Sequence, residues 1–115
     1  MKTVKMLIIA LFASLAVWAN NPLHDETITF KVFGNCEMCK ERIEKAMKLQ
    51  GVKSCVWNVD TKIATVIFDT HSVAPDGIHK AIAAVGYDTE KVRADDKAYK
   101  KLPGCCQYER EKVKK

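Results

Sequence analysis

The sequence has no apolar run of the roughly 20 residues that a helix needs to cross a bilayer. The apolar stretch from Met6 to Val17 has about a dozen residues and follows two lysines, which is typical of a secretory signal peptide. We expect residues 1–19 to be this peptide, with cleavage after Ala19, and the protein to be periplasmic or otherwise exported. An uncleaved anchor is the alternative. No cysteine follows Ala19 directly, so a lipid anchor is not expected, and membrane contact would come only through the signal peptide.

The rest of the chain lacks a strong excess of either charge. Without Lys2 and Lys5 the 19 basic residues fall to 17 against 14 acidic ones, which lowers the formal charge from +5 to +3. This weak excess does not indicate a nucleic-acid partner. The chain also lacks internal repeats, and its length suits one small domain, which we place at residues 20–94. Basic residues gather in 95–115, a C-terminal tail that we expect to be solvated.

Three segments alternate apolar with polar residues, at 28–32, 55–59 and 64–68. This period predicts three half-buried strands. The residues Asp60-Thr61-Lys62 can turn, so the second and third strands are expected to form a hairpin. A last short strand, with Val92 facing inward, is expected near the end of the domain.

Apolar residues recur at helical spacing in two other segments. The first predicted helix runs from Cys39 to Val52, where Gly51 ends it. The second begins at Pro75, and Gly86 suits its C-terminal cap. Each helix has one apolar face, so each is expected to lie on the sheet.

The order strand, helix, strand, strand, helix, strand predicts an α+β fold, the ferredoxin-like βαββαβ sandwich. Its four-stranded antiparallel sheet would carry both helices on one face. One end of this fold would gather four residues: Cys36, Cys39, Asp60 and Tyr87. His24 and His71 would lie at the other end and His79 on the solvent side of its helix, so no histidine is expected to bind a metal.

The motif Cys36-Glu37-Met38-Cys39 stands where the first strand gives way to the first helix. Two cysteines at this spacing can aim both sulfur atoms at one point. Free N–H groups and the positive end of the helix dipole would stabilise their thiolates, and Lys40 adds positive charge. Two thiolates suit Cu(I) or Hg(II), whereas Zn(II) would need four ligands. The motif therefore predicts a soft-metal site.

Together these residues resemble the heavy-metal-associated domain family over about Thr27 to Ala94. The resemblance is carried by Phe33-Gly34-Asn35-Cys36, Cys39, Ile43, Gly51-Val52 and Gly86-Tyr87. It implies a ferredoxin-like fold that binds Cu(I) or another soft metal ion such as Hg(II). It also implies a metal-transporting membrane protein or another metallochaperone as partner, because the family includes copper chaperones, domains of metal-pumping ATPases and the periplasmic mercury-binding protein.

The resemblance implies Cys36 and Cys39 as metal ligands. Asn35, Lys40 and Tyr87 would lie beside the metal without binding it. The family's loop usually carries a methionine where this sequence has Gly34. We expect Met38 or Phe33 to supply the apolar contact that this methionine makes.

The main alternative is a small thiol-disulfide oxidoreductase that uses Cys36 and Cys39, since a Cys-x-x-Cys motif also marks thioredoxin-like enzymes. A purely structural disulfide is a further alternative. A thioredoxin-like enzyme would typically place a cis-proline opposite the motif, and beyond the signal peptide the only prolines are Pro22, Pro75 and Pro103. We therefore expect a metal-binding protein rather than an enzyme.

The other three cysteines have separate expectations. Cys55 is in phase with the inward residues of its strand, so we expect a small buried hydrophobe. Cys105 and Cys106 follow Pro103-Gly104 in the tail and are candidate auxiliary metal ligands. The tail would leave the last strand about 20 Å from the metal site, a distance that ten residues can cover. A vicinal or inter-chain disulfide, or a second thiol site, are the alternatives.

Overall fold

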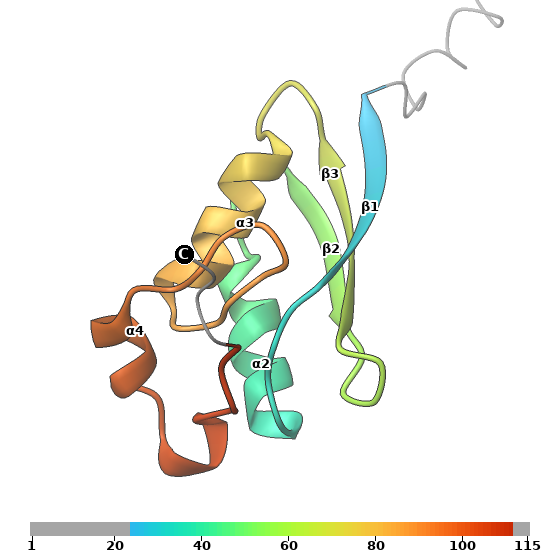
Figure 1. Cartoon of the computed structure of the whole chain (residues 1–115). Helices are drawn as coiled ribbons and strands as arrows, with labels where there is room; N and C mark the ends of the chain where they lie inside the picture. The colour runs from blue at the N-terminus through green and yellow to red at the C-terminus, as the bar shows by residue number, and fades with distance from the viewer. Residues whose placement is uncertain (1–23, 112–115) are drawn as a thin grey trace, which may run out of the picture.

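A three-stranded antiparallel sheet carries two helices on one face (Figure 1). The computed structural model of the protein describes residues 24–111, so the predicted signal peptide lies outside the described residues. Five elements build this layer pair: β1 (Asp25–Lys31), α2 (Glu37–Ala46), β2 (Val52–Trp57), β3 (Ile63–Asp69) and α3 (Pro75–Ala84). The strand order is β1-β3-β2, so β3 is central. Between residues 24 and 111, no helix is long and apolar enough to cross a membrane.

The inward residues of the strands are those that the alternating pattern predicted. Phe30 pairs with Ala64 across β1 and β3, and Trp57 pairs with Ala64 from the other side. All three are buried, as are Val66 and Phe68 further along β3. Their side chains meet Ile43 of α2 and Ile82 of α3 in one hydrophobic core, so the helices cover this face and leave the other to solvent.

The first helix is shorter than predicted. α2 ends at Ala46 rather than near Val52, because the next N–H groups turn to carbonyls three residues back, Met47 to Glu44 and Lys48 to Lys45. The prediction for α3 is confirmed at its start, with Pro75 in the first turn.

Gly86 closes α3 as predicted. Its φ of +105° and the bonds from the N–H groups of Gly86 and Tyr87 to the carbonyls of Ala83 and Ile82 form a Schellman motif. Tyr87 therefore follows directly on a fixed helix end.

The predicted fourth strand is reduced to one bridge, so the four-stranded sheet is wrong. Thr89 pairs with Val32 beside β1, but its N–H and hydroxyl then bond to Val92, which turns the chain away. The Glu90 side chain accepts a hydrogen bond from the N–H of Lys31 at 2.9 Å. In a full fourth strand, a backbone carbonyl of that strand would have accepted this bond. A local turn thus replaces strand pairing.

The C-terminal segment folds back onto the domain instead of running free in solvent. It contains a short helix, α4 (Asp96–Lys100), and a 3₁₀ turn, η2 (Gly104–Cys106). The expectation of a solvated tail is wrong for Leu102, Cys106 and Tyr108, which are all buried. Because the chain never crosses the sheet as a fourth strand, the predicted 20 Å separation from the cysteine motif does not arise.

Candidate metal centre

The loop after β1 and the first turn of α2 position the two motif cysteines. Cys36 is the N-cap of α2 in extended conformation, and its carbonyl accepts the N–H of Lys40 at 3.0 Å. Cys39 lies in the first helical turn and is buried. The Asn35 N–H donates to the Cys39 sulfur at 3.4 Å. The backbone of the loop just before α2 thus supplies a donor to the Cys39 thiol.

A third sulfur atom joins them from the C-terminal segment. The Sγ atoms of Cys36, Cys39 and Cys106 all lie within 4.8 Å of one another. Cys39 and Cys106 are buried and Cys36 is half-buried. In the described part of the chain, no histidine or carboxylate belongs to this cluster. A set of three soft donors fits a soft ion and leaves a tetrahedral Zn(II) one ligand short.

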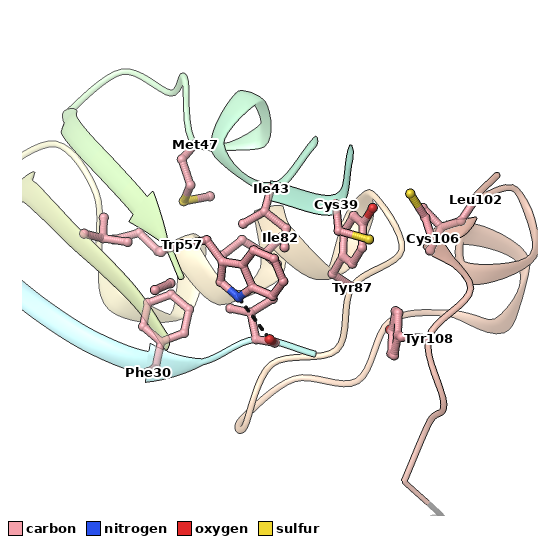
Figure 2. Packing of buried hydrophobic residues seen from close by; sticks show 14 of the residues in the cluster. Phe30, Cys39, Ile43, Met47, Trp57, Ile82, Tyr87, Leu102, Cys106 and Tyr108 are labelled. Carbon is pink, nitrogen blue, oxygen red and sulfur yellow. Dashed lines mark hydrogen bonds between the residues drawn. The ribbon is translucent and has the colours of Figure 1, made fainter. Parts of the chain in front are cut away.

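Tyr87 points its hydroxyl toward these sulfurs (Figure 2). The side chain is fully buried, yet its hydroxyl oxygen has no hydrogen-bond partner among the residues that the structure describes. Burial, and then the neighbouring Cys106 and Cys39, raise the pKa of this hydroxyl far above its usual value. Tyr87 therefore stays protonated and keeps its O–H donor directed at the sulfur cluster.

The environment shifts the two buried thiols in opposite directions. Burial alone would raise the pKa of Cys39, but the backbone N–H groups of Asn35 and Cys36, with Tyr87 and Cys106, bring that pKa below its usual value. Burial raises the pKa of Cys106 to about 12, and the nearby Cys39 adds to the rise. Negative charge at this cluster is thus favoured first on Cys39.

The apolar support of the loop comes from Trp57. A Cβ at Gly34 would lie 3.0 Å from the Trp57 ring, so the indole occupies the space that a larger side chain would take. The indole N–H donates to the carbonyls of Val32 and Lys62, which fixes the ring. Of the two residues expected to support the loop, Met38 is 45% exposed, whereas Phe33 is half-buried and packs against the core.

The residues expected beside the metal have distinct contacts. The Asn35 side chain donates to the Cys105 carbonyl at 3.4 Å and so connects the loop to the C-terminal segment. The Lys40 ammonium pairs with the Glu44 carboxylate and donates to the Trp57 carbonyl at 3.1 Å. Glu44 therefore partly neutralises the charge of Lys40, which weakens the electrostatic effect of Lys40 on the thiols.

The other sequence-predicted residues lie away from the cluster. Cys55 is half-buried against the core, and burial raises the pKa of its thiol to about 11. His24 and His71 contact each other, with ring centroids 3.9 Å apart. The solvent-side placement of His79 is wrong, because it is buried against Phe30 and bonded to Thr89.

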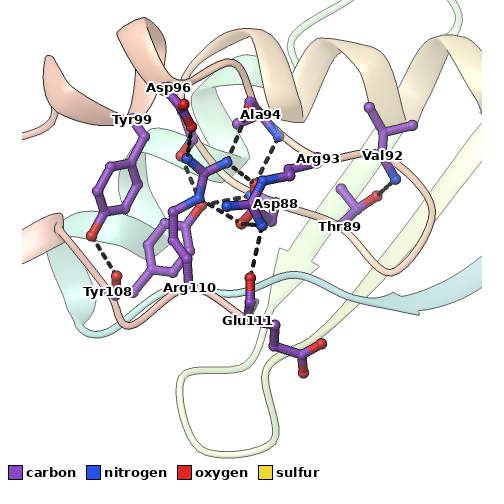
Figure 3. A network of polar contacts seen from close by, with 11 residues as sticks. Asp88, Thr89, Val92, Arg93, Ala94, Asp96, Tyr99, Tyr108, Arg110 and Glu111 are labelled. Atoms are coloured by element: carbon purple, nitrogen blue, oxygen red, sulfur yellow. Dashed lines mark hydrogen bonds and ion pairs between the residues drawn. The ribbon is translucent and has the colours of Figure 1, made fainter. Parts of the chain in front are cut away.

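Sequence reasoning missed the residues that hold the C-terminal segment in place. The Tyr108 hydroxyl accepts the N–H of Asp88 at 2.8 Å and donates to the Gly86 carbonyl at 2.9 Å. The Arg110 guanidinium takes both oxygens of Asp88, at 2.7 and 3.0 Å, and also reaches Asp96 (Figure 3). The signal was the alternation of Cys106, Tyr108 and Arg110, a strand-like pattern inside a charged tail.

Comparison with known proteins shows which family this chain resembles. The sequence profile of the heavy-metal-associated domain matches residues 29–88. Among solved structures, a CopZ metallochaperone is similar at 30% identity and a TM-score of 0.54, over 56% of this chain and 98% of that one. Oxidised MerP from Ralstonia metallidurans CH34 is similar at 31% identity and a TM-score of 0.55, over 57% of this chain and 94% of that one.

Two curated relatives match a similar share of the chain. A copper-exporting P-type ATPase of Staphylococcus saprophyticus is 32% identical over 68 residues, which are 57% of this chain and 9% of the ATPase. Mouse copper-transporting ATPase 1 is 39% identical over 62 residues, 52% of this chain and 4% of that protein. The chain thus spans less than a tenth of the curated relatives that it matches. With the profile match, the fold and the cysteine pair at the start of α2, the chain belongs to the heavy-metal-associated family.

Proposed function

We propose that this protein binds one soft metal ion, Cu(I) or Hg(II), through Cys36 and Cys39, and transfers or sequesters it outside the cytoplasm. The convergence of these sulfur atoms at the start of α2 carries the proposal. Thiolate sulfur prefers soft ions, and the helix end offsets part of the negative charge that two thiolates bring. The metal is cargo, and the protein is a carrier rather than an enzyme.

Transfer to another protein follows from the uneven burial of the ligands. Cys36 is half-buried whereas Cys39 is buried, so a partner's thiolate reaches the metal from the Cys36 side. Ligands then exchange one at a time, and the ion is never released free into water. The partner would be a metal-transporting membrane protein or another metallochaperone. This part of the proposal is supported by the similarity to a CopZ metallochaperone and to copper-transporting ATPases.

The site of action outside the cytoplasm is proposed from the sequence of residues 1–19. Expression of the full chain, followed by separation of cell fractions, should recover a shortened protein whose first residue is Asn20. Recovery of the full-length chain from the cytoplasm would contradict export. It would not bear on the proposal that Cys36 and Cys39 bind a metal.

The decisive experiment is a competitive titration of the fully reduced protein with Cu(I), Hg(II) and Zn(II). We expect one Cu(I) or Hg(II) per chain and at least a thousandfold preference over Zn(II), equivalent to about 4 kcal/mol. Exchange of both Cys36 and Cys39 for serine should abolish tight binding, and full affinity in this double variant would refute the proposal. A thiol-disulfide oxidoreductase would instead reduce disulfide substrates without metal, so an insulin-reduction assay on the same samples separates the two functions.

A further inference from the structure

The third sulfur atom of the cluster comes from a part of the chain outside the family match. Cys106 lies 18 positions beyond residue 88, where the match ends. Its side chain is 0% exposed although the segment around it is rich in charge. The turn η2 carries it there, with the Cys106 N–H bonded to the Pro103 carbonyl at 2.8 Å. The family's fold alone therefore does not account for this ligand.

The two adjacent cysteines of η2 face different ways. The Cys105 carbonyl points into the loop, where it accepts the Asn35 side-chain amide and the Cys36 thiol, at 3.4 and 3.7 Å. Its own thiol is exposed and contacts the Met38 sulfur at 3.5 Å. Cys106 points inward to Cys39 and Tyr87 (Figure 2). One cysteine thus belongs to the cluster and its neighbour does not.

Contacts made by residues that follow Cys106 in the sequence hold Cys106 in this position. Tyr108 bonds to the backbone of Gly86 and Asp88, on either side of Tyr87, and its ring stacks on the Tyr87 ring with centroids 5.8 Å apart. Arg110 closes the segment through a bidentate pair with Asp88, whose side chain is 8% exposed. Two-point contacts of this kind fix orientation as well as distance. The third sulfur is therefore held in place before any metal arrives.

We propose that residues 95–111 form a clasp that supplies Cys106 as a third metal ligand and must open before the metal is transferred. This inference rests on the proposed function of Cys36 and Cys39. Three thiols lose their protons to solvent and bind one soft ion in a trigonal site. Around Cu(I) such a site carries a net charge of −2, and the Tyr87 hydroxyl, which has no other partner among the described residues, is the donor that stabilises it. The clasp thus explains why the buried Tyr87 hydroxyl has no other partner among the described residues.

Two other roles for Cys106 predict different behaviour. As a small core hydrophobe, it would contribute to stability alone and leave the metal with two sulfurs. As half of a vicinal disulfide it would be bonded to Cys105, but the five cysteines are free and these two sulfurs are 4.0 Å apart. Metal retention and sulfur count separate these roles from the clasp.

The test compares Cys106→Ser with Cys105→Ser, two identical exchanges at adjacent positions of the full-length chain. X-ray absorption of the Cu(I) protein should give three sulfurs per copper in wild type and Cys105→Ser, and two in Cys106→Ser. Loss of Cu(I) to excess chelator should be about a hundredfold faster in Cys106→Ser, the lower end of the gain from a tethered contact. Cys106→Ala, checked for wild-type circular dichroism, repeats the measurement without a hydroxyl.

The outcomes assign failure to one claim or the other. Two sulfurs in the wild-type protein, or release rates of the two serine variants within tenfold of each other, would overturn the clasp and leave the two-cysteine site intact. A wild-type protein that binds neither Cu(I) nor Hg(II) would instead refute the proposed function itself.

Discussion

Exchange of Tyr108 for phenylalanine should loosen the clasp without altering any thiol. The hydroxyl holds two buried backbone groups, the Asp88 N–H and the Gly86 carbonyl, at 2.8 and 2.9 Å. Phenylalanine keeps the ring on Tyr87 but leaves both groups without a partner while the clasp is closed. A buried group left unsatisfied costs about 1–3 kcal/mol, so the closed form should lose about 2 kcal/mol or more. At a factor of ten for each 1.4 kcal/mol, the clasp-open population rises roughly 30-fold.

Amide hydrogen exchange is the measurement for this prediction. Protection at 104–110 should fall by roughly 30-fold, while protection in β3 stays near the wild-type value. Tyr99→Phe is the matched control, because Tyr99 donates one bond to the Tyr108 carbonyl and the same exchange removes only that bond. A net loss of about 1 kcal/mol should change protection there by about fivefold. Equal effects of the two variants, or unchanged protection in Tyr108→Phe, would refute the inference that the Tyr108 hydroxyl holds the clasp closed.

Three further predictions concern the packing around Gly34, the loss of stability at low pH, and the Cys55 thiol. Gly34→Ala should destabilise the fold by about 1–3 kcal/mol and weaken Cu(I) binding, because its Cβ would lie 3.0 Å from a fixed Trp57 ring; Gly104→Ala, with nothing within 4 Å, should be close to neutral in the same melts. The Asp88 carboxyl is buried, which would raise its pKa, but Arg110 and the Ala94 N–H hold that pKa below its usual value. Its contribution to stability is therefore full above the unfolded pKa of about 3.9 and is lost as pH falls through the lower folded value, so Asp88→Asn should flatten urea-melt stability below about pH 4. Cys55→Ala should cost about 1 kcal/mol with unchanged metal affinity, and iodoacetamide should label Cys105 before Cys55, whose raised pKa keeps it protonated.

The sequence was sufficient for the parts of the fold that follow a simple period. Inward residues on β1 and β3, the start of α3 and its Gly86 cap each depend on local spacing or on one backbone conformation. The fourth strand failed for the opposite reason. Whether this strand forms depends on whether the Lys31 N–H donates to a backbone carbonyl or to the Glu90 carboxylate. The spacing of apolar residues does not predict which acceptor it takes. The predicted solvent-side position of His79 was wrong for a similar reason, because the side chain has a buried hydrogen-bond partner in Thr89.

The position of the motif cysteines was predictable because a strand followed by a helix N-terminus is a local arrangement. The position of Cys106 was not, because it depends on contacts across more than 15 residues, such as Arg110 with Asp88 and Tyr108 with Gly86. Composition was misleading here, since lysines dominate the segment by number although Leu102, Cys106 and Tyr108 are buried. The alternation of Cys106, Tyr108 and Arg110 with polar residues is a local sign in the sequence that the segment packs on the domain.

The clasp changes what kind of carrier this family member would be. A site of two thiolates gives up its ion readily, because an incoming thiolate meets an under-coordinated metal. A third sulfur held by Tyr108 and Arg110 fills that open position, so spontaneous loss slows while Cys36 stays half-buried at the edge. A partner that binds near Asn35 would first separate the Cys105 carbonyl from the loop, since Asn35 bonds to both sides, and its thiolate would then replace Cys36. Release would then depend on the partner's surface as well as on its thiolates, which favours delivery to a specific acceptor over loss to any competing thiol.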